Sequence, residues 1–224
     1  MTIIDSVNVK ECPHCNKFIG VFNQLSGNTF GGIYWTDGKS CFPMLEQYNS
    51  LVKTHCCGNL IWLDKLDVID KIKLYPRNES EVESKKNLFE KLLSYENPEF
   101  NDYIQLINEL SITQDEERNY RLLAWWAGND IRREYHYKKR RINEDKYYEM
   151  SVGEKNNIKI LFNLLNDKVQ NEIIAKAEIK RELGEFEQAI NLLTYVTDYE
   201  LKIYSEMILE LCLQKDFSVR EVII

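Results

Sequence analysis

The chain has 224 residues, of which 44% are hydrophobic and 12% aromatic, so it can bury a core and is not of the disordered class. Its formal net charge of -7 argues against binding nucleic acid through overall charge. No run approaches the ~18 apolar residues needed to cross a bilayer. Acidic and basic residues balance over residues 1–75, so the excess of acid lies in the remainder.

The N-terminus and the cysteines indicate a compartment. Residues 1–6 contain neither the basic nor the apolar segment of a secretion signal, so we expect a cytoplasmic protein without a membrane segment. Five of the six cysteines precede residue 60, which favours thiolate metal ligands in a reducing compartment over a disulfide framework. Cys212 is the exception, and we expect it to be a small buried side chain of the last helix.

Two cysteine-rich segments have the pattern of the two turns of a zinc ribbon. They are Cys12-Pro13-His14-Cys15 and His55-Cys56-Cys57-Gly58. β-prone residues flank the first turn, as expected if two strands meet there. Asn16 and Gly58 follow the second cysteine of each turn, where the backbone often adopts a positive φ. The pattern therefore predicts a small β domain organised around Zn²⁺.

The spacing fixes only part of the ligand set. A regular second turn would carry cysteine at position 54, where the chain has Thr54. We predict three regular ligands, Cys12, Cys15 and Cys57. For the fourth ligand we rank three candidates in the order Cys56, His55, Cys41. Four protein ligands leave no open position for water or substrate, so the expected Zn²⁺ is structural.

An inserted hairpin is expected between the two turns. Gly27-Asn28 and Asp37-Gly38 are turn signals on either side of a β-prone run. After the second turn, the segment 60–63 is expected to be the closing strand. The hairpin offers three candidates for a recognition surface, Tyr34, Trp35 and Lys39. The alternative is that these side chains only pack the strands.

A change of pattern near residue 78 predicts two domains, 1–77 and 78–224. Glycine becomes scarce there, and the apolar spacing changes from two towards three and four. Capping boxes at Ser80/Glu83, Thr113/Glu116 and Ser151/Glu154 mark helix starts. We expect helices near residues 80–93, 100–110, 113–126, 151–165, 167–183, 186–193 and 198–211. The predicted class is α+β: a small zinc-ribbon β domain followed by an all-α helical bundle or short solenoid.

One helix pair resembles the middle of a tetratricopeptide repeat (TPR). The resemblance is carried by Ala177, the Leu183-Gly184 pair, Phe186 and Ala189, and it covers little more than one repeat. It implies a tight turn at Gly184 and close helix packing. In that family, stacked repeats bind peptides or partner proteins on a concave face, and the resemblance implies the same here.

A second resemblance covers most of the chain. It is carried by the Cys-Pro-His-Cys turn, the segments 25–30 and 37–39, Ala124-Trp125-Trp126 with Asn129-Asp130, and Leu183-Gly184. On these residues the chain resembles a family of uncharacterised bacterial proteins. The resemblance brings no known activity with it, and Thr54 departs from the regular second turn.

Two further groups suggest binding surfaces. Trp125 and Trp126, followed by Asn129 and Asp130, suit an aromatic pocket with a polar lip. The alternative places one tryptophan in the core and the other between helices. The second group, Arg132 and Arg133 with the basic run 138–141, resembles a patch for a nucleic-acid backbone. Its alternative is a solvated helix end.

No catalytic arrangement is recognisable in the sequence. Two of the three histidines fall in the cysteine segments and the third in the basic run, and the carboxylates are spread along helix faces. We therefore predict a non-enzymatic intracellular protein-interaction module, an adaptor or an inhibitor, with a structural zinc head and an acidic helical binding surface. The alternative prediction is a nucleic-acid-associated zinc-ribbon protein that uses the local basic patch.

Overall fold

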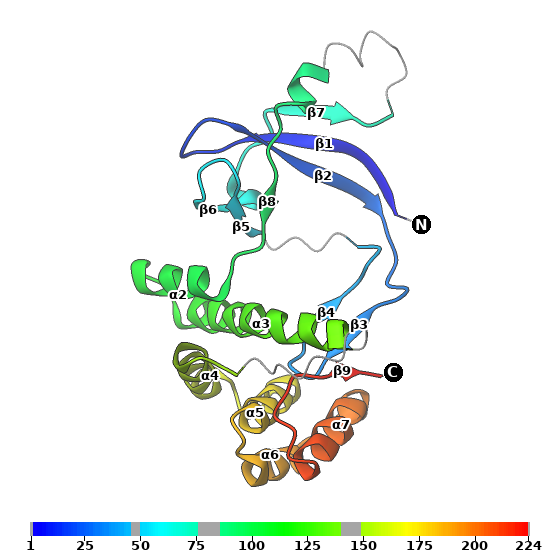
Figure 1. Cartoon of the computed structure of the whole chain (residues 1–224), viewed down its shortest axis with the longest axis vertical. Coiled ribbons are helices and arrows are strands. Elements are labelled where there is room, and N and C mark those ends of the chain that lie inside the picture. The colour runs from blue at the N-terminus through cyan, green and yellow to red at the C-terminus, as the bar shows by residue number, and fades with distance from the viewer. Residues whose placement is uncertain (1, 46–49, 76–85, 140–148, 224) are drawn as a thin grey trace. The chain divides into compact units, whose positions relative to one another are not determined.

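The computed structural model describes residues 2–45, 50–75, 86–139 and 149–223, with backbone only for 134–139 (Figure 1). These form two compact units: residues 1–32 with 41–98, and residues 33–40 with 99–224. The first is built of strands and the second mainly of helices, so the α+β class is confirmed. The capping box expected at Ser80/Glu83 and the basic side chains of 138–141 lie outside the described residues.

Two antiparallel three-stranded sheets make up most of the N-terminal unit. The first has the order β2-β1-β7, with β1 Ile3–Glu11, β2 Phe18–Ser26 and β7 Asp70–Lys73. The second has the order β6-β5-β8, with β5 Leu51–Thr54, β6 Leu60–Trp62 and β8 Tyr95–Glu96. The expected strands around the first cysteine turn are β1 and β2, and the expected closing strand is β6. Each cysteine turn therefore joins two paired strands.

The boundary between the units lies at residue 98 and not at 77. Residues 86–89 are helical, but the predicted first helix ends there. Leu93 instead donates its N–H to the Phe18 carbonyl at 2.9 Å and accepts the Gly20 N–H at 3.3 Å. Leu92 packs against the apolar face of β1 and β7. The open edge of β2 satisfies these backbone groups, and this tertiary pairing overrides the local helical pattern.

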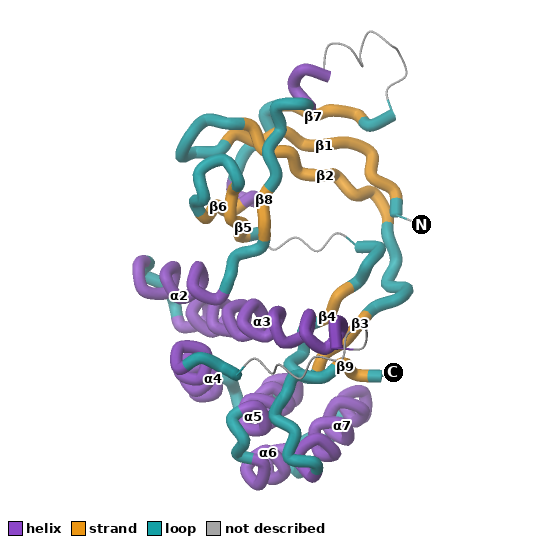
Figure 2. The backbone as a smooth tube through the Cα atoms, in the orientation of Figure 1, coloured by secondary structure: helices purple, strands orange, loops and turns teal. Residues whose placement is uncertain are grey.

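Six of the predicted helices are present in the second unit (Figure 2). They are α2 Phe100–Glu109, α3 Gln114–Lys139, α4 Val152–Leu164, α5 Gln170–Glu182, α6 Phe186–Leu193 and α7 Lys202–Leu213, the last preceded by the 3-10 turn Tyr199–Leu201. Two of the three predicted capping boxes are confirmed: the N–H groups of Glu116 and Glu154 donate to the hydroxyls of Thr113 and Ser151. No helix in the described part of the chain is both long and apolar enough to span a bilayer.

The TPR-like residues form a helix–turn–helix. Gly184 has a φ of 77° and lies between α5 and α6. Its N–H donates to the Arg181 carbonyl, and the next N–H donates to the Lys180 carbonyl, which together close a Schellman motif. Ala177 and Ala189 are fully buried in one cluster. Their small side chains allow the two helices to pack closely, as the resemblance implied.

The predicted hairpin between the cysteine turns is formed, but it belongs to the helical unit. It consists of β3 Ile33–Trp35 and β4 Ser40–Cys41, with the turn at Asp37-Gly38. On its other side β3 pairs with β9 Glu221–Val222, which gives the sheet order β4-β3-β9. A two-residue strand has too little pattern for sequence reasoning, and β9 was not predicted.

Candidate metal centre

Four thiols from the two cysteine turns lie together in the N-terminal unit. The Sγ atoms of Cys12, Cys15, Cys56 and Cys57 are all within 4.8 Å of one another. The Sγ of Cys57 is 3.7 Å from that of Cys12 and 3.8 Å from that of Cys56. Thiolates on a tetrahedral ion with bonds of about 2.3 Å are ~3.8 Å apart, whereas disulfide sulfurs are ~2.0 Å apart. The spacing therefore fits a shared metal ion and excludes a disulfide.

The two turns share the same backbone geometry. The Asn16 N–H donates to the Cys12 carbonyl at 2.9 Å, and the Gly58 N–H donates to the Thr54 carbonyl at 2.8 Å. The N–H groups of Cys12 and Thr54 each donate to the carbonyl five residues further along, at 2.9 and 3.0 Å. Asn16 and Gly58 have φ values of 58° and 72°, which confirms the predicted left-handed positions.

Thr54 therefore occupies the place of the first cysteine in a regular turn. Its hydroxyl oxygen lies 3.4 Å from the Sγ of Cys57. The fourth thiol comes from Cys56, at the position that the exposed His14 holds in the first turn. Relative to a regular turn, one ligand is therefore moved by two residues, from position 54 to Cys56. The hydroxyl of Thr54, at the regular position, contacts the Sγ of Cys57.

The two alternative fourth ligands lie apart from the cluster. The Nδ1 of His55 is 2.7 Å from the Ser94 hydroxyl, and its Nε2 is 3.4 Å from the Glu96 carboxylate. Cys41 is exposed and stands in β4. Neither residue belongs to the group of close metal-ligating atoms found among the described residues. Cys56, the candidate ranked first, is the one that the fold brings to the other three.

The surroundings of the thiols differ. The pKa of Cys57 is lowered to about 6, because the Thr54 hydroxyl and the Asn59 N–H donate to its sulfur. The Asn59 amide adds a third donor at 3.3 Å. Burial raises the pKa of Cys12 to about 12. One thiol is therefore held ready as a thiolate, whereas Cys12 lies in the apolar core. Cys212 is buried, as expected, and burial raises its pKa to about 11.

Most side chains predicted as a binding surface lie inside the helical unit. Five of them are at most 5% exposed: Trp35, Trp125, Asn129, Arg132 and Arg133. Trp125 is in a core cluster, while the Nε1 of Trp126 donates to the Asp37 carbonyl at 2.9 Å. Lys39 pairs with Asp130 at 2.6 Å, and Tyr34 is half-buried in β3. The five buried side chains pack inside the unit and are not exposed on its surface.

A buried ionic cluster accounts for these positions. Arg133 pairs with the carboxylate of Asp37, whose exposed fraction is 2%. Asn129 donates to Asp37 at 2.9 Å and to Glu182 at 3.1 Å. Beside them Arg181 donates to Glu178 at 2.5 and 2.7 Å. Arg132 is also paired internally, with Glu154 at 2.8 Å in the same unit. The predicted basic patch thus loses its first two arginines to internal pairs.

Sequence reasoning missed this cluster. It described the carboxylates only as spread along helix faces, although Glu178 and Glu182 are buried. Their only signal in the sequence is that they share α5 with buried alanine and isoleucine. Within the cluster, three buried carboxyls face two guanidiniums. Burial and the neighbouring carboxylates of Glu178 and Asp37 raise the pKa of Glu182 to about 8.

Comparison with protein-family models, with curated proteins and with solved structures finds no match for this chain. The resemblance to a bacterial family therefore stays a prediction. The functional conclusion rests on the geometry of the thiol cluster and on the surface of the helical unit.

Proposed function

We propose that the chain is a non-enzymatic protein-interaction module, an adaptor or an inhibitor, whose N-terminal head is held by one structural Zn²⁺. The proposal rests on one observation, the four Sγ atoms within 4.8 Å of one another. A tetrahedral set of four thiolates is typical of zinc, which brings no redox chemistry of its own. With four protein ligands no position is left for water or substrate, so the ion organises the head and does not catalyse.

The core of the head supports a structural role for the ion. Cys12 is fully buried in a small cluster with Ile19, Val52, Ile61 and Leu63. In this cluster Val52 and Ile61 come from strands of only four and three residues, whereas Ile19 comes from the nine-residue β2. So small a core contributes little folding free energy by itself. Metal binding supplies the remainder, because the site forms only when the two turns come together.

The helical unit supplies the proposed partner surface. Tyr195 and Tyr199 are 60% and 85% exposed in the segment that connects α6 to α7, and Asp198 and Glu200 are exposed between and beside them. Exposed tyrosines are enriched where proteins bind proteins. The residues after 75 carry the excess of negative charge, which suits a basic partner surface. We place the partner on this acidic aromatic surface, next to the TPR-like helix pair.

Elemental analysis of the untagged protein tests the zinc site. We expect about one zinc ion per chain in the wild type, and its loss in Cys57→Ser. The matched control is Cys41→Ser, which removes an exposed cysteine outside the cluster and should keep the metal. Wild-type protein purified without metal would overturn the zinc head, as would metal loss in the control variant.

Affinity capture from host lysate tests the partner surface. We expect a protein partner to bind the wild type and to be lost with Tyr199→Ser. The control is Tyr75→Ser, which removes a tyrosine of similar exposure, 80%, from the N-terminal unit. Equal capture of the partner by the two variants would contradict the placement of the partner surface at Tyr199. Retention on a nucleic-acid matrix with steep salt dependence would favour the nucleic-acid alternative over the adaptor.

A further inference from the structure

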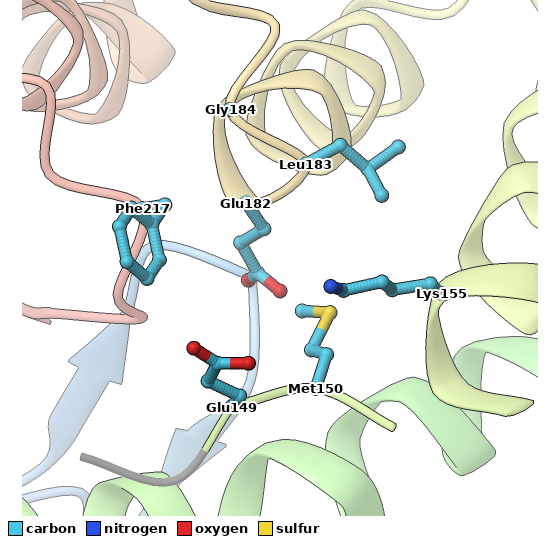
Figure 3. Close-up of a pocket in the computed structure, with 7 residues that line it drawn as sticks. All are labelled: Glu149, Met150, Lys155, Glu182, Leu183, Gly184 and Phe217. Carbon is cyan, nitrogen blue, oxygen red and sulfur yellow. The ribbon is translucent and has the colours of Figure 1, made fainter. Parts of the chain in front are cut away.

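A pocket with a volume of about 290 Å³ opens in the helical unit. It is lined by residues that precede α4, lie in α4, end α5 and follow α7: Glu149, Met150, Lys155, Glu182, Leu183, Gly184 and Phe217 (Figure 3). The volume is close to the lower end of the range for small-molecule sites, about 300–1,000 Å³. A ligand that fills it is small.

Charged groups of both signs converge on this pocket. Figure 3 shows the carboxyl of Glu182 and the ammonium of Lys155 pointing towards one another, with the carboxylate of Glu149 nearby. The other side chains that line the pocket are apolar: Met150 and Leu183 lie on one side of Glu182 and Phe217 on the other. The pocket thus combines two acids, one base and an apolar wall.

Glu182 is held rigidly at the floor of the pocket. It is 5% exposed, and its carboxyl accepts the Nε1–H of Trp125 at 3.0 Å and the Nδ2–H of Asn129 at 3.1 Å. These donors fix the orientation of the carboxyl before any ligand arrives, which is what a specific site requires. Neither donor carries a charge, and burial with the neighbouring carboxylates of Glu178 and Asp37 raises the pKa of this carboxyl, so a cation bound beside it in the pocket would favour its ionised form.

We propose that this pocket binds a small zwitterion, an α-amino acid with an apolar side chain. Its ammonium lies between Glu182 and Glu149, its carboxylate meets Lys155, and its side chain packs on the apolar wall. A simple anion could pair with Lys155, but it would leave the two acids without a cation. A simple amine could pair with the acids, but it would leave the ammonium of Lys155 without a carboxylate from the ligand. Only a ligand with both charges pairs every charged group that lines the pocket.

Calorimetric titration of the full chain with L-leucine and two matched probes tests the chemical class. 3-Methylbutylamine lacks the carboxylate of leucine, and 4-methylpentanoate lacks its ammonium. We expect saturable binding of leucine and at least tenfold weaker binding of each probe. L-Methionine and L-phenylalanine serve as further apolar amino acids. The proposal is overturned if none of the amino acids binds saturably at millimolar concentration, or if the amine binds as tightly as leucine.

Two variants assign the charged groups. Lys155→Met should weaken leucine binding about tenfold and leave binding of the amine unchanged or tighter. Glu149→Gln should weaken both, and it changes an exposed side chain, so folding is preserved. The control is Lys159→Met, which removes an exposed lysine of the same helix that does not line the pocket. If this control weakens binding as much as Lys155→Met, the effect is one of net charge and the proposed geometry is wrong.

Discussion

Each of the two units gathers ionisable side chains, but the units neutralise these groups differently. The N-terminal unit gathers four thiols, whose ionisation calls for an external cation. The helical unit gathers three carboxyls and supplies its own cations, Arg133 and Arg181. With the proposed zinc ion bound, the stability of the first unit should depend on the metal in solution. The stability of the second depends on its sequence and on pH.

Removal of the metal should cause the largest difference in stability between the two units. We expect a chelator to unfold the N-terminal unit, because apparent binding free energies of structural zinc are on the order of 10 kcal/mol and act as folding energy. Amide hydrogen exchange should show protection lost in β1 and β2 and retained in α5. Equal loss of protection in both units, or none in either, would contradict the comparison.

Breaking the buried pair of the helical unit should have the next largest effect. Arg133→Met leaves the Asp37 carboxyl buried without its cationic partner and should cost about 3–5 kcal/mol of unfolding free energy. Urea unfolding measures this loss, and the double variant with Asp37→Asn should recover part of it. The control is Lys39→Met, which breaks the partly exposed pair with Asp130 and should cost ~1 kcal/mol or less.

The pH dependence of the helical unit should come partly from Glu182. Its pKa is raised to about 8, so the folded state binds this proton more tightly than the unfolded state does. The resulting stability is complete below pH ~4.3, the ordinary pKa of glutamate, and is lost as the pH rises to about 8. One group contributes at most about 1.4 kcal/mol per pH unit.

Urea unfolding of Glu182→Gln across the same pH range isolates this group. The variant keeps an oxygen that can accept the Trp125 N–H, and it should flatten the fall in stability between pH 5 and 8. Besides the pocket residues Glu149 and Lys155, the carboxyls of Glu178 and Asp37 face Glu182. A slope that is unchanged in the variant would assign the pH dependence to these neighbours.

A smaller effect is expected from Thr54 in the N-terminal unit. Thr54→Val has a similar shape but loses the hydroxyl that lies 3.4 Å from the Sγ of Cys57. Loss of one such supporting hydrogen bond should lower zinc affinity about tenfold. Competition with a chromogenic chelator measures this change. An unchanged affinity would show that the hydroxyl contributes nothing to the ligand set.

Local signals in the sequence predicted much of the fold. The helices of the second unit were expected from apolar periodicity and capping boxes, and the turn geometry at Asn16 and Gly58 from the need for a positive φ. These features depend on neighbouring residues only. The choice of Cys56 as the fourth thiol stayed open in the sequence, because it depends on how the two turns face each other in space.

Long-range features were not predictable from local pattern. The pairing of β3 with β9 joins residues that lie near opposite ends of the sequence. The units divide at residue 98 and not at the predicted 77, because Leu93 pairs with β2 and β8 pairs with β5. The binding-surface prediction for Trp125, Asn129 and Arg133 also depended on tertiary context, since a charged or amphipathic side chain at a helical position can face either solvent or a buried partner.

The path of residues 33–40 has a consequence for fragments of this protein. The chain leaves the N-terminal unit at residue 32, pairs β3 with β9, returns at residue 41 and leaves again at 98. A protease that cuts once after residue 98 therefore does not release the N-terminal unit, because the hairpin stays anchored in the helical unit. Likewise, a fragment that ends at residue 98 exposes the edge of β3 that β9 covers, and such an open edge invites aggregation.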